Sequence, residues 1–236
     1  MSSPQNSGNG HGILNISLRT AAVLLLFTLA FTTLMAITYT ATKDPIAASA
    51  EAEKLRLIGE VLPPGAYDND LLKDYADLPA TPELGLDQPT HAYRARKGGE
   101  PAALVFEAAA PDGYSGRIGL ILAVRTSGAS NELVAVRVTE HKETPGLGDY
   151  IDPRKDKNKD HPWIKQFDDQ GFAKLPAEQW RVKKDGGHFE QRSGATISAR
   201  AVTNAVARAL KWAEAHRQDL FAGGAPTSPA TPAPKP

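Results

Sequence analysis

The longest run of apolar positions in the chain covers residues 21–41. It contains no charged residue and has about the length of a bilayer hydrocarbon core. Residues 21–41 are therefore predicted to form one transmembrane helix. A buried core helix explains the run less well, because nothing nearby supplies the helices needed to surround an all-apolar cylinder. A cleaved signal peptide is the closer alternative, since Ala48-Ser49-Ala50 is a small-x-small site, but this site lies well beyond the end of the run.

The charges that flank this run predict its orientation. Arg19 is the only Lys or Arg before the run, whereas Lys43 after it is neighboured by Asp44. Because positive charge favours the cytoplasmic side, residues 1–20 are predicted to be a cytoplasmic amino-terminal segment. The rest of the chain is then predicted to lie outside the cytoplasm.

Residues 42–90 are predicted to form a stalk helix followed by a connector. Asp44-Pro45 is a pattern typical of a helix start, and Pro63-Pro64-Gly65 is typical of a helix end. Beyond Gly65, as far as residue 90, prolines and acidic residues occur with little periodicity, which is typical of a loop. The folded domain is expected to begin near His91.

Alternation of apolar and polar positions then predicts four strands, over residues 91–96, 103–108, 117–125 and 132–140. The last two are separated by a short turn over residues 126–131 that contains Gly128, so they are expected to pair antiparallel. The predicted fold class is α+β, with a twisted antiparallel sheet that has one buried face and is packed by helices.

The last periodic segment covers residues 198–216, where apolar positions recur at the three- and four-residue spacing of an amphipathic helix. This helix is expected to lie on the sheet. Residues 91–222 are thus predicted to be one domain. The proline-rich tail, residues 223–236, lacks a core and is predicted to be disordered.

Composition and charge exclude several classes of function for this chain. Lys+Arg and Asp+Glu are both 27, and the resulting net charge of zero removes the positive field on which non-specific nucleic-acid binding depends, so nucleic acid is not an expected partner. The absence of cysteine excludes disulfides, thiolate catalysis and cysteine-ligated metal sites. The histidines show no HExxH spacing, and no catalytic residue or metal site is predicted. If this chain transfers electrons, it must do so through a bound cofactor, because it has no cysteine.

Two loops between the predicted strands and the predicted helix stand out. Asp112-Gly113-Tyr114-Ser115-Gly116 reads as a tight glycine turn that holds an aromatic ring. The second loop, residues 140–149 (EHKETPGLGD), combines charges with two glycines and a proline. Glycine permits close approach of the backbone to a ligand and proline keeps the loop in shape, so this loop is either a binding loop for a planar ligand or an ordinary surface turn.

The segment Ser193-Gly194-Ala195-Thr196-Ile197-Ser198 leads into the predicted helix. The first N–H groups of a helix and its macrodipole favour an anion such as phosphate, and the small residues before Thr196 leave its hydroxyl open to modification. The residues alone leave two interpretations. Thr196 carries a phosphate-linked group, or the segment is an ordinary helix cap, a role that Ser198 could fill by itself.

These three segments, in this order, resemble the FMN-binding domain of the G subunit of Rnf-type ion-translocating electron-transport complexes, which is related to the C subunit of sodium-pumping NADH:quinone reductases. The resemblance extends over about residues 91–216 and includes the single amino-terminal anchor. It implies a membrane-anchored flavoprotein subunit that relays electrons through FMN, as part of electron transport coupled to ion translocation.

The resemblance also implies roles for individual residues. Thr196 would bear the FMN through a phosphoester bond. The motif recognised by the flavin transferase would include Ser193, Gly194 and Ala195. The residues expected near the flavin are Tyr114 and Ser115 in the first loop, and Glu143, Thr144, Pro145, Gly146 and Leu147 in the second. The family usually has an aspartate three residues before the serine of the motif, where this chain has Glu190, which keeps the charge with a longer reach.

The implied partners are the other membrane subunits of the Rnf complex, the flavin transferase during maturation, and the membrane. The implied location is the bacterial inner membrane, with one span and a periplasmic carboxy-terminal domain. Two alternatives stay open. One is the C subunit of a sodium-pumping NADH:quinone reductase. The other is a non-redox extracytoplasmic binding or scaffold module in which SGAT is only a helix cap.

Overall fold

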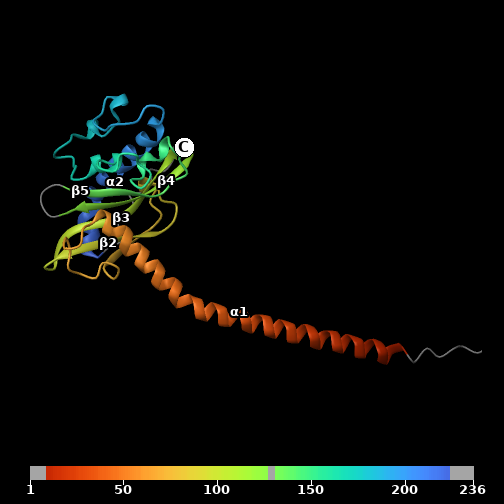
Figure 1. Cartoon of the computed structure of the whole chain (residues 1–236). Coiled ribbons are helices and arrows are strands. Elements are labelled where there is room, and N and C mark those ends of the chain that lie inside the picture. The colour runs from red at the N-terminus through yellow and green to blue at the C-terminus, as the bar shows by residue number, and fades with distance from the viewer. Residues whose placement is uncertain (1–8, 127–130, 224–236) are drawn as a thin grey trace, which may run out of the picture. The chain divides into compact units, whose positions relative to one another are not determined.

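The computed structural model describes residues 9–126 and 131–223, and the chain divides into two compact units, Met1–Glu53 and Lys54–Pro236 (Figure 1). The first unit contains most of helix α1 (Asn9–Val61). Its stretch Asn15–Lys43 has a mean hydropathy of 2.2, and all its side chains are exposed. This stretch is long and apolar enough to cross a membrane, and its exposure separates it from a core helix of a soluble protein.

Helix α1 differs from the prediction at Pro45, which lies inside the helix instead of starting a second one. Proline has a helical φ and removes one backbone hydrogen bond, so good helix formers on both sides can continue the helix through it. The Ser49 hydroxyl donates to the carbonyl of Pro45 at 2.8 Å. The predicted end of the helix before Pro63 is confirmed, since α1 ends at Val61.

The second unit is built on a five-stranded antiparallel sheet in which each strand pairs with the next one along the chain. The strands are β1 (Tyr75–Leu78), β2 (Thr90–Lys97), β3 (Glu100–Gly113), β4 (Gly116–Arg125) and β5 (Glu132–Glu140). The four predicted strands are confirmed as β2 to β5, with β3 longer than expected. The expected turn between β4 and β5, with Gly128, lies largely outside the described residues.

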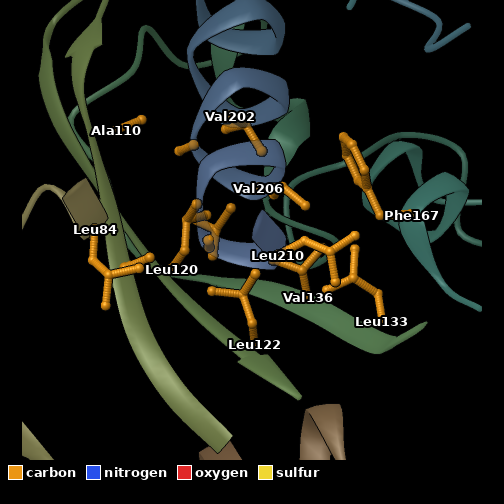
Figure 2. Close-up of a cluster of buried hydrophobic side chains, with 14 of the residues drawn as sticks. Leu84, Ala110, Leu120, Leu122, Leu133, Val136, Phe167, Val202, Val206 and Leu210 are labelled. Atoms are coloured by element: carbon orange, nitrogen blue, oxygen red, sulfur yellow. The ribbon is translucent and has the colours of Figure 1, made fainter. Parts of the chain in front are cut away.

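Helix α2 (Thr196–Ala222) covers one face of the sheet and confirms the predicted amphipathic helix. Figure 2 shows Val202, Val206 and Leu210 of α2 packed with side chains of β4 and β5. The buried residues of α2 include every predicted apolar position, namely Ala201, Val202, Ala205, Val206, Ala209, Leu210 and Ala213. The helix starts two residues earlier than predicted and ends at Gly223, whose φ of 90° suits glycine.

The other face of the sheet is also covered, which corrects the expectation of one buried face. Ile58, Val61, Leu62 and Leu71 pack against this face. The reason can be seen in the sequence of β4. Ile121 and Ala123 alternate with the residues that face α2, so they point to the other face, and both are apolar. The compact unit therefore begins at Lys54, earlier than the expected start near His91, and includes part of the predicted stalk and connector.

The polar segment between β5 and α2 contains short 3₁₀ helices, among them η2 (Gly148–Ile151) and η3 (Trp163–Phe167). Trp163 and Phe167 are buried, and the Phe167 ring stacks on Phe189 with centroids 4.4 Å apart. A single β-bridge joins Val182 to Phe189. This packing holds the segment that enters α2.

Candidate functional site

Three segments that lie far apart in the sequence meet around one cavity of about 270 Å³. They are the turn between β3 and β4, the loop between β5 and η2, and the start of α2. The cavity is lined by Tyr114, Glu143, Thr144, Leu147, Gly148, Gly194, Ala195, Ile197 and Ser198. The structure thus brings together residues from all three segments that the sequence singled out.

The other residues named from the sequence lie next to this lining without being part of it. Ser115, Pro145, Gly146 and Ser193 are exposed, and Thr196 is half-buried as the first residue of α2.

Three lining residues were not among the predicted site residues, namely Gly148, Ile197 and Ser198. All three lie within or directly beside the predicted motifs, so their position in the sequence was a usable signal.

The rim of the cavity is apolar. Tyr114, Leu147 and Ile197 each come from a different one of the three segments, and their exposed fractions are 68%, 54% and 45%. Large apolar side chains at the mouth of a cavity favour contact with an apolar surface such as an aromatic ring system.

The start of α2 carries no side-chain cap. Ala195 is the N-cap residue and makes no side-chain cap hydrogen bond. The Ser198 hydroxyl donates instead to Oε2 of Glu143. The sequence-based alternative in which Ser198 caps the helix is therefore wrong, and this end of α2 keeps the unpaired donors and the partial positive charge that attract an anion.

The turn before α2 is held from below by Tyr150. Its hydroxyl donates to the carbonyl of Ala195 and accepts from the N–H of Arg192, both at 3.2 Å. Burial raises the pKa of Tyr150, so the phenol stays neutral and can donate its hydrogen bond to the carbonyl of Ala195. Gly194, between these two anchors, has a φ of 83°, which favours glycine at this position.

A buried carboxylate, Asp156, also fixes this turn. Asp156 pairs with the guanidinium of Arg192 and accepts the N–H of Trp163 at 2.7 Å. Burial alone would raise the pKa of Asp156, but the N–H groups of Trp163 and Asn158 and the charge of Arg192 outweigh burial and hold the pKa below its usual value. Asp156 is therefore ionised at physiological pH and holds Arg192 in place.

Glu143 connects the three segments. Its side chain is 4% exposed, and Oε1 accepts the N–H of Ser115 at 3.0 Å while Oε2 accepts the hydroxyl of Ser198. The N–H of Glu143 donates to Nδ1 of His141 at 3.2 Å. One carboxylate thus ties the β3–β4 turn and helix α2 to the loop that follows β5.

This arrangement suits a ligand with two different ends. The uncapped start of α2 fits a phosphate, and the cavity with its apolar rim fits part of a planar ring. A cavity of about 270 Å³ lies just below the usual size for a whole cofactor, so such a ligand would be partly exposed. In the described part of the chain, no three His, Asp or Glu side chains gather into a group that could hold a metal ion.

Comparison with known proteins yields two family matches. The FMN-binding domain family matches residues 113–211, and the RnfG N-terminal region family matches residues 12–61. The first match covers the cavity and all three segments around it. The second covers the stretch that is long and apolar enough to cross a membrane.

Similar proteins extend over most of the chain. It is 43% identical over 205 residues to the G subunit of the ion-translocating oxidoreductase complex of Pseudomonas aeruginosa (strain UCBPP-PA14), and the alignment covers 87% of this chain and 92% of that protein. It is 41% identical over 199 residues to the corresponding G subunit from Pseudoalteromonas atlantica, covering 84% of this chain and 89% of that one. The crystal structure of Shewanella oneidensis NqrC aligns with 60% of this chain and 64% of that chain, at 20% identity and a TM-score of 0.39.

Proposed function

This chain belongs to the family of G subunits of ion-translocating oxidoreductase complexes, and on that premise we propose that it relays electrons through FMN joined to Thr196 by a phosphoester bond. The observation that carries the proposal is the convergence of three segments on one cavity beside an uncapped helix start. The match to the FMN-binding domain family over residues 113–211 supports flavin as the ligand.

The phosphate end of the ligand belongs at the start of α2. Thr196 is the first residue of a 27-residue helix and is half-buried, so its hydroxyl is close to the unpaired N–H groups and still open to modification. A phosphate joined there gains from these donors and from the helix dipole. Because the link is covalent, the cofactor is retained where free FMN is scarce.

The ring end belongs against the cavity. Tyr114, Leu147 and Ile197 offer apolar contacts, and the backbone of Gly148 and Gly194 permits close approach. When bound, FMN supplies the one- and two-electron chemistry. The protein keeps the ring in position, excludes water from the side that faces the cavity, and leaves the other side open to a redox partner.

The partners and location follow from family membership and the apolar helix. We expect α1 to span the bacterial inner membrane over Asn15–Lys43, with the amino terminus in the cytoplasm and the flavin domain in the periplasm. The partners are the other membrane subunits of the complex, which couple electron flow to ion translocation. The flavin transferase acts on the segment Ser193-Gly194-Ala195-Thr196, and the exposed Glu190 side chain lies on the surface beside it.

A single substitution tests the attachment. Thr196→Val keeps the shape of the side chain and removes the hydroxyl, so the variant should fold normally and carry no covalent flavin. The full-length protein is produced in a host that contains the flavin transferase, and covalent flavin is detected by fluorescence on a denaturing gel and by the mass of the peptide that spans residues 192–200.

The matched control is Thr203→Val, on the same helix about two turns later. The Thr203 hydroxyl donates to the carbonyl of Ala199 within the helix, and this variant should keep covalent flavin. Fluorescence that persists on the gel in Thr196→Val would refute the attachment site. A colourless wild-type protein from the same host would favour the binding or scaffold alternative.

A further inference from the structure

Glu143 is a buried acid in an unusual environment. Its carboxylate is held by a backbone N–H and a hydroxyl, neither of which carries a charge. The charged groups near it in sequence pair elsewhere, since Glu140 pairs with Arg117, and His141 Nε2 lies 3.8 Å from the carboxylate of Asp152. Burying a carboxylate with neutral partners alone is costly, and such costs are retained mainly at functional sites.

Two glycines leave room for the carboxylate of Glu143. A Cβ atom added to Gly148 would lie 2.8 Å from Oε2 of Glu143, and one added to Gly113 would lie 2.9 Å from Oε1. Both distances are shorter than real Cβ contacts allow. Two glycines from different segments therefore flank the two oxygens, so the burial of the acid is a built feature of the site.

Glu143 also lines the cavity, together with Ser198, which donates to it. A charge at this position acts on whatever occupies the cavity. In an environment with little water, the field of a fixed carboxylate is screened less than at the surface. A negative charge opposes the addition of an electron to a neighbouring group.

We propose that Glu143 is a positioning residue of the flavin site whose carboxylate, bridged between Ser115 and Ser198, lowers the reduction potential of the bound FMN. The inference rests on the proposed function, because it requires the flavin to occupy the cavity. The bridge sets where the negative charge lies relative to the cavity, and the Ser198 hydroxyl partly offsets that charge by directing its proton at Oε2.

The first test is Glu143→Gln, which removes the charge and keeps the size of the side chain. The full-length flavinylated protein in detergent is titrated with dithionite, which supplies two electrons per flavin while the protons come from solvent. The equilibrium constant for two-electron reduction should rise at least tenfold, which corresponds to a potential about 30 mV more positive.

The matched control is Glu140→Gln, three residues earlier. Glu140 carries the same charge, but its side chain is 68% exposed and pairs with Arg117 at 3.3 Å. Water screens this charge, so its removal should change the potential far less. An equal shift in both variants would show that the effect comes from net charge and would overturn the inference.

Ser198→Ala gives an independent test, because it removes the donor and leaves the charge. This variant should have a more negative potential than the wild type. The two variants are thus expected to shift in opposite directions, whereas a merely structural role would shift both the same way or neither. If Glu143→Gln does not fold, Ser198→Ala decides alone, and an unchanged or more positive potential overturns the inference.

The proposed function and this inference fail differently. A wild-type protein without flavin overturns both. Flavin present at wild-type levels with an unchanged potential in Glu143→Gln overturns only the role of Glu143.

Discussion

Gly148 lines the cavity of the candidate site and tests how tightly the wall of that cavity is packed. Its backbone conformation is open to other residues, because its φ is not positive. The space around it is not, since an added Cβ would lie 2.6 Å from the Ser198 hydroxyl oxygen and 2.8 Å from Oε2 of Glu143. Gly148→Ala therefore drives one methyl group into the bridge between the loop and α2.

The cost of this methyl group can be worked out from its neighbours. Overpacking a tight site costs about 1–3 kcal/mol. Moving Ser198 away from Glu143 costs about another 1 kcal/mol in a lost hydrogen bond. Alanine has less conformational entropy than glycine in the unfolded chain, and this difference offsets the cost by about 0.4–1 kcal/mol. We expect Gly148→Ala to lower the free energy of unfolding by about 1–3.5 kcal/mol.

The three tryptophans of the chain provide the assay. Trp163, Trp180 and Trp212 are all buried in the second unit, so tryptophan fluorescence follows the unfolding of this unit in the full-length protein. Urea titration of flavin-free protein in detergent, from a host without the flavin transferase, yields the free energy of unfolding without flavin emission.

Gly59→Ala is the matched control. Gly59 lies in α1 within the same unit, and outside its own stretch of helix no atom of the described residues lies within 4 Å of its added Cβ. Alanine in a helix should raise the free energy of unfolding by up to about 1 kcal/mol. A Gly148→Ala protein as stable as the wild type, or more stable, would refute the argument that the bridge is tightly packed.

Two further predictions concern charged groups that hold the site and its helix. Arg94→Met should lower the free energy of unfolding by about 2 kcal/mol in the urea assay, because it removes hydrogen bonds to Asp74 at 2.6 Å and to the carbonyl of Leu220 near the end of α2 at 3.0 Å, while Asp74 stays paired with Arg96; Arg117→Met, which breaks an exposed pair, should cost less than about 1 kcal/mol. The pKa of Asp156 is lower in the folded protein, so its contribution is present above its unfolded pKa of about 3.9 and is lost as the pH falls through the folded value. Asp156→Asn should therefore be less stable at neutral pH and lose less stability on acidification, and an unchanged pH profile would contradict this.

The regular part of the fold follows from the sequence because its patterns are long. The apolar runs of β4 and β5 and the apolar stripe along α2 each extend over several positions, and burial of these side chains fixes the register. Strand β1 (Tyr75–Leu78) has only four residues among acids and prolines, too few to show a period. Its partners lie in β2, so it forms through tertiary pairing that local preference does not reveal.

The candidate site was predicted in its parts, and its internal bonds were not. Tyr114, the 143–147 loop and the SGAT segment carry recognisable motifs, and the structure places them around one cavity. The bridge from Glu143 to Ser198 joins residues 55 positions apart. Nothing in either motif names the other as its partner, because that pairing depends on how the sheet and α2 pack.

The hydroxyls of Thr196 and Ser198 lie in different surroundings at the start of α2. On the proposed function, this difference would let Thr196 be modified while Ser198 keeps its hydrogen bond to Glu143. Ser198 is buried and donates to Glu143, whereas Thr196 is half-buried. Two positions along a helix are about 200° apart, so the side chains at 196 and 198 do not lie on the same face of α2. A group attached to Thr196 therefore leaves the bridge intact. On the proposed function, the two residues at the helix start therefore have different roles. Ser198 fixes the cavity wall, and Thr196 is the residue that the transferase modifies.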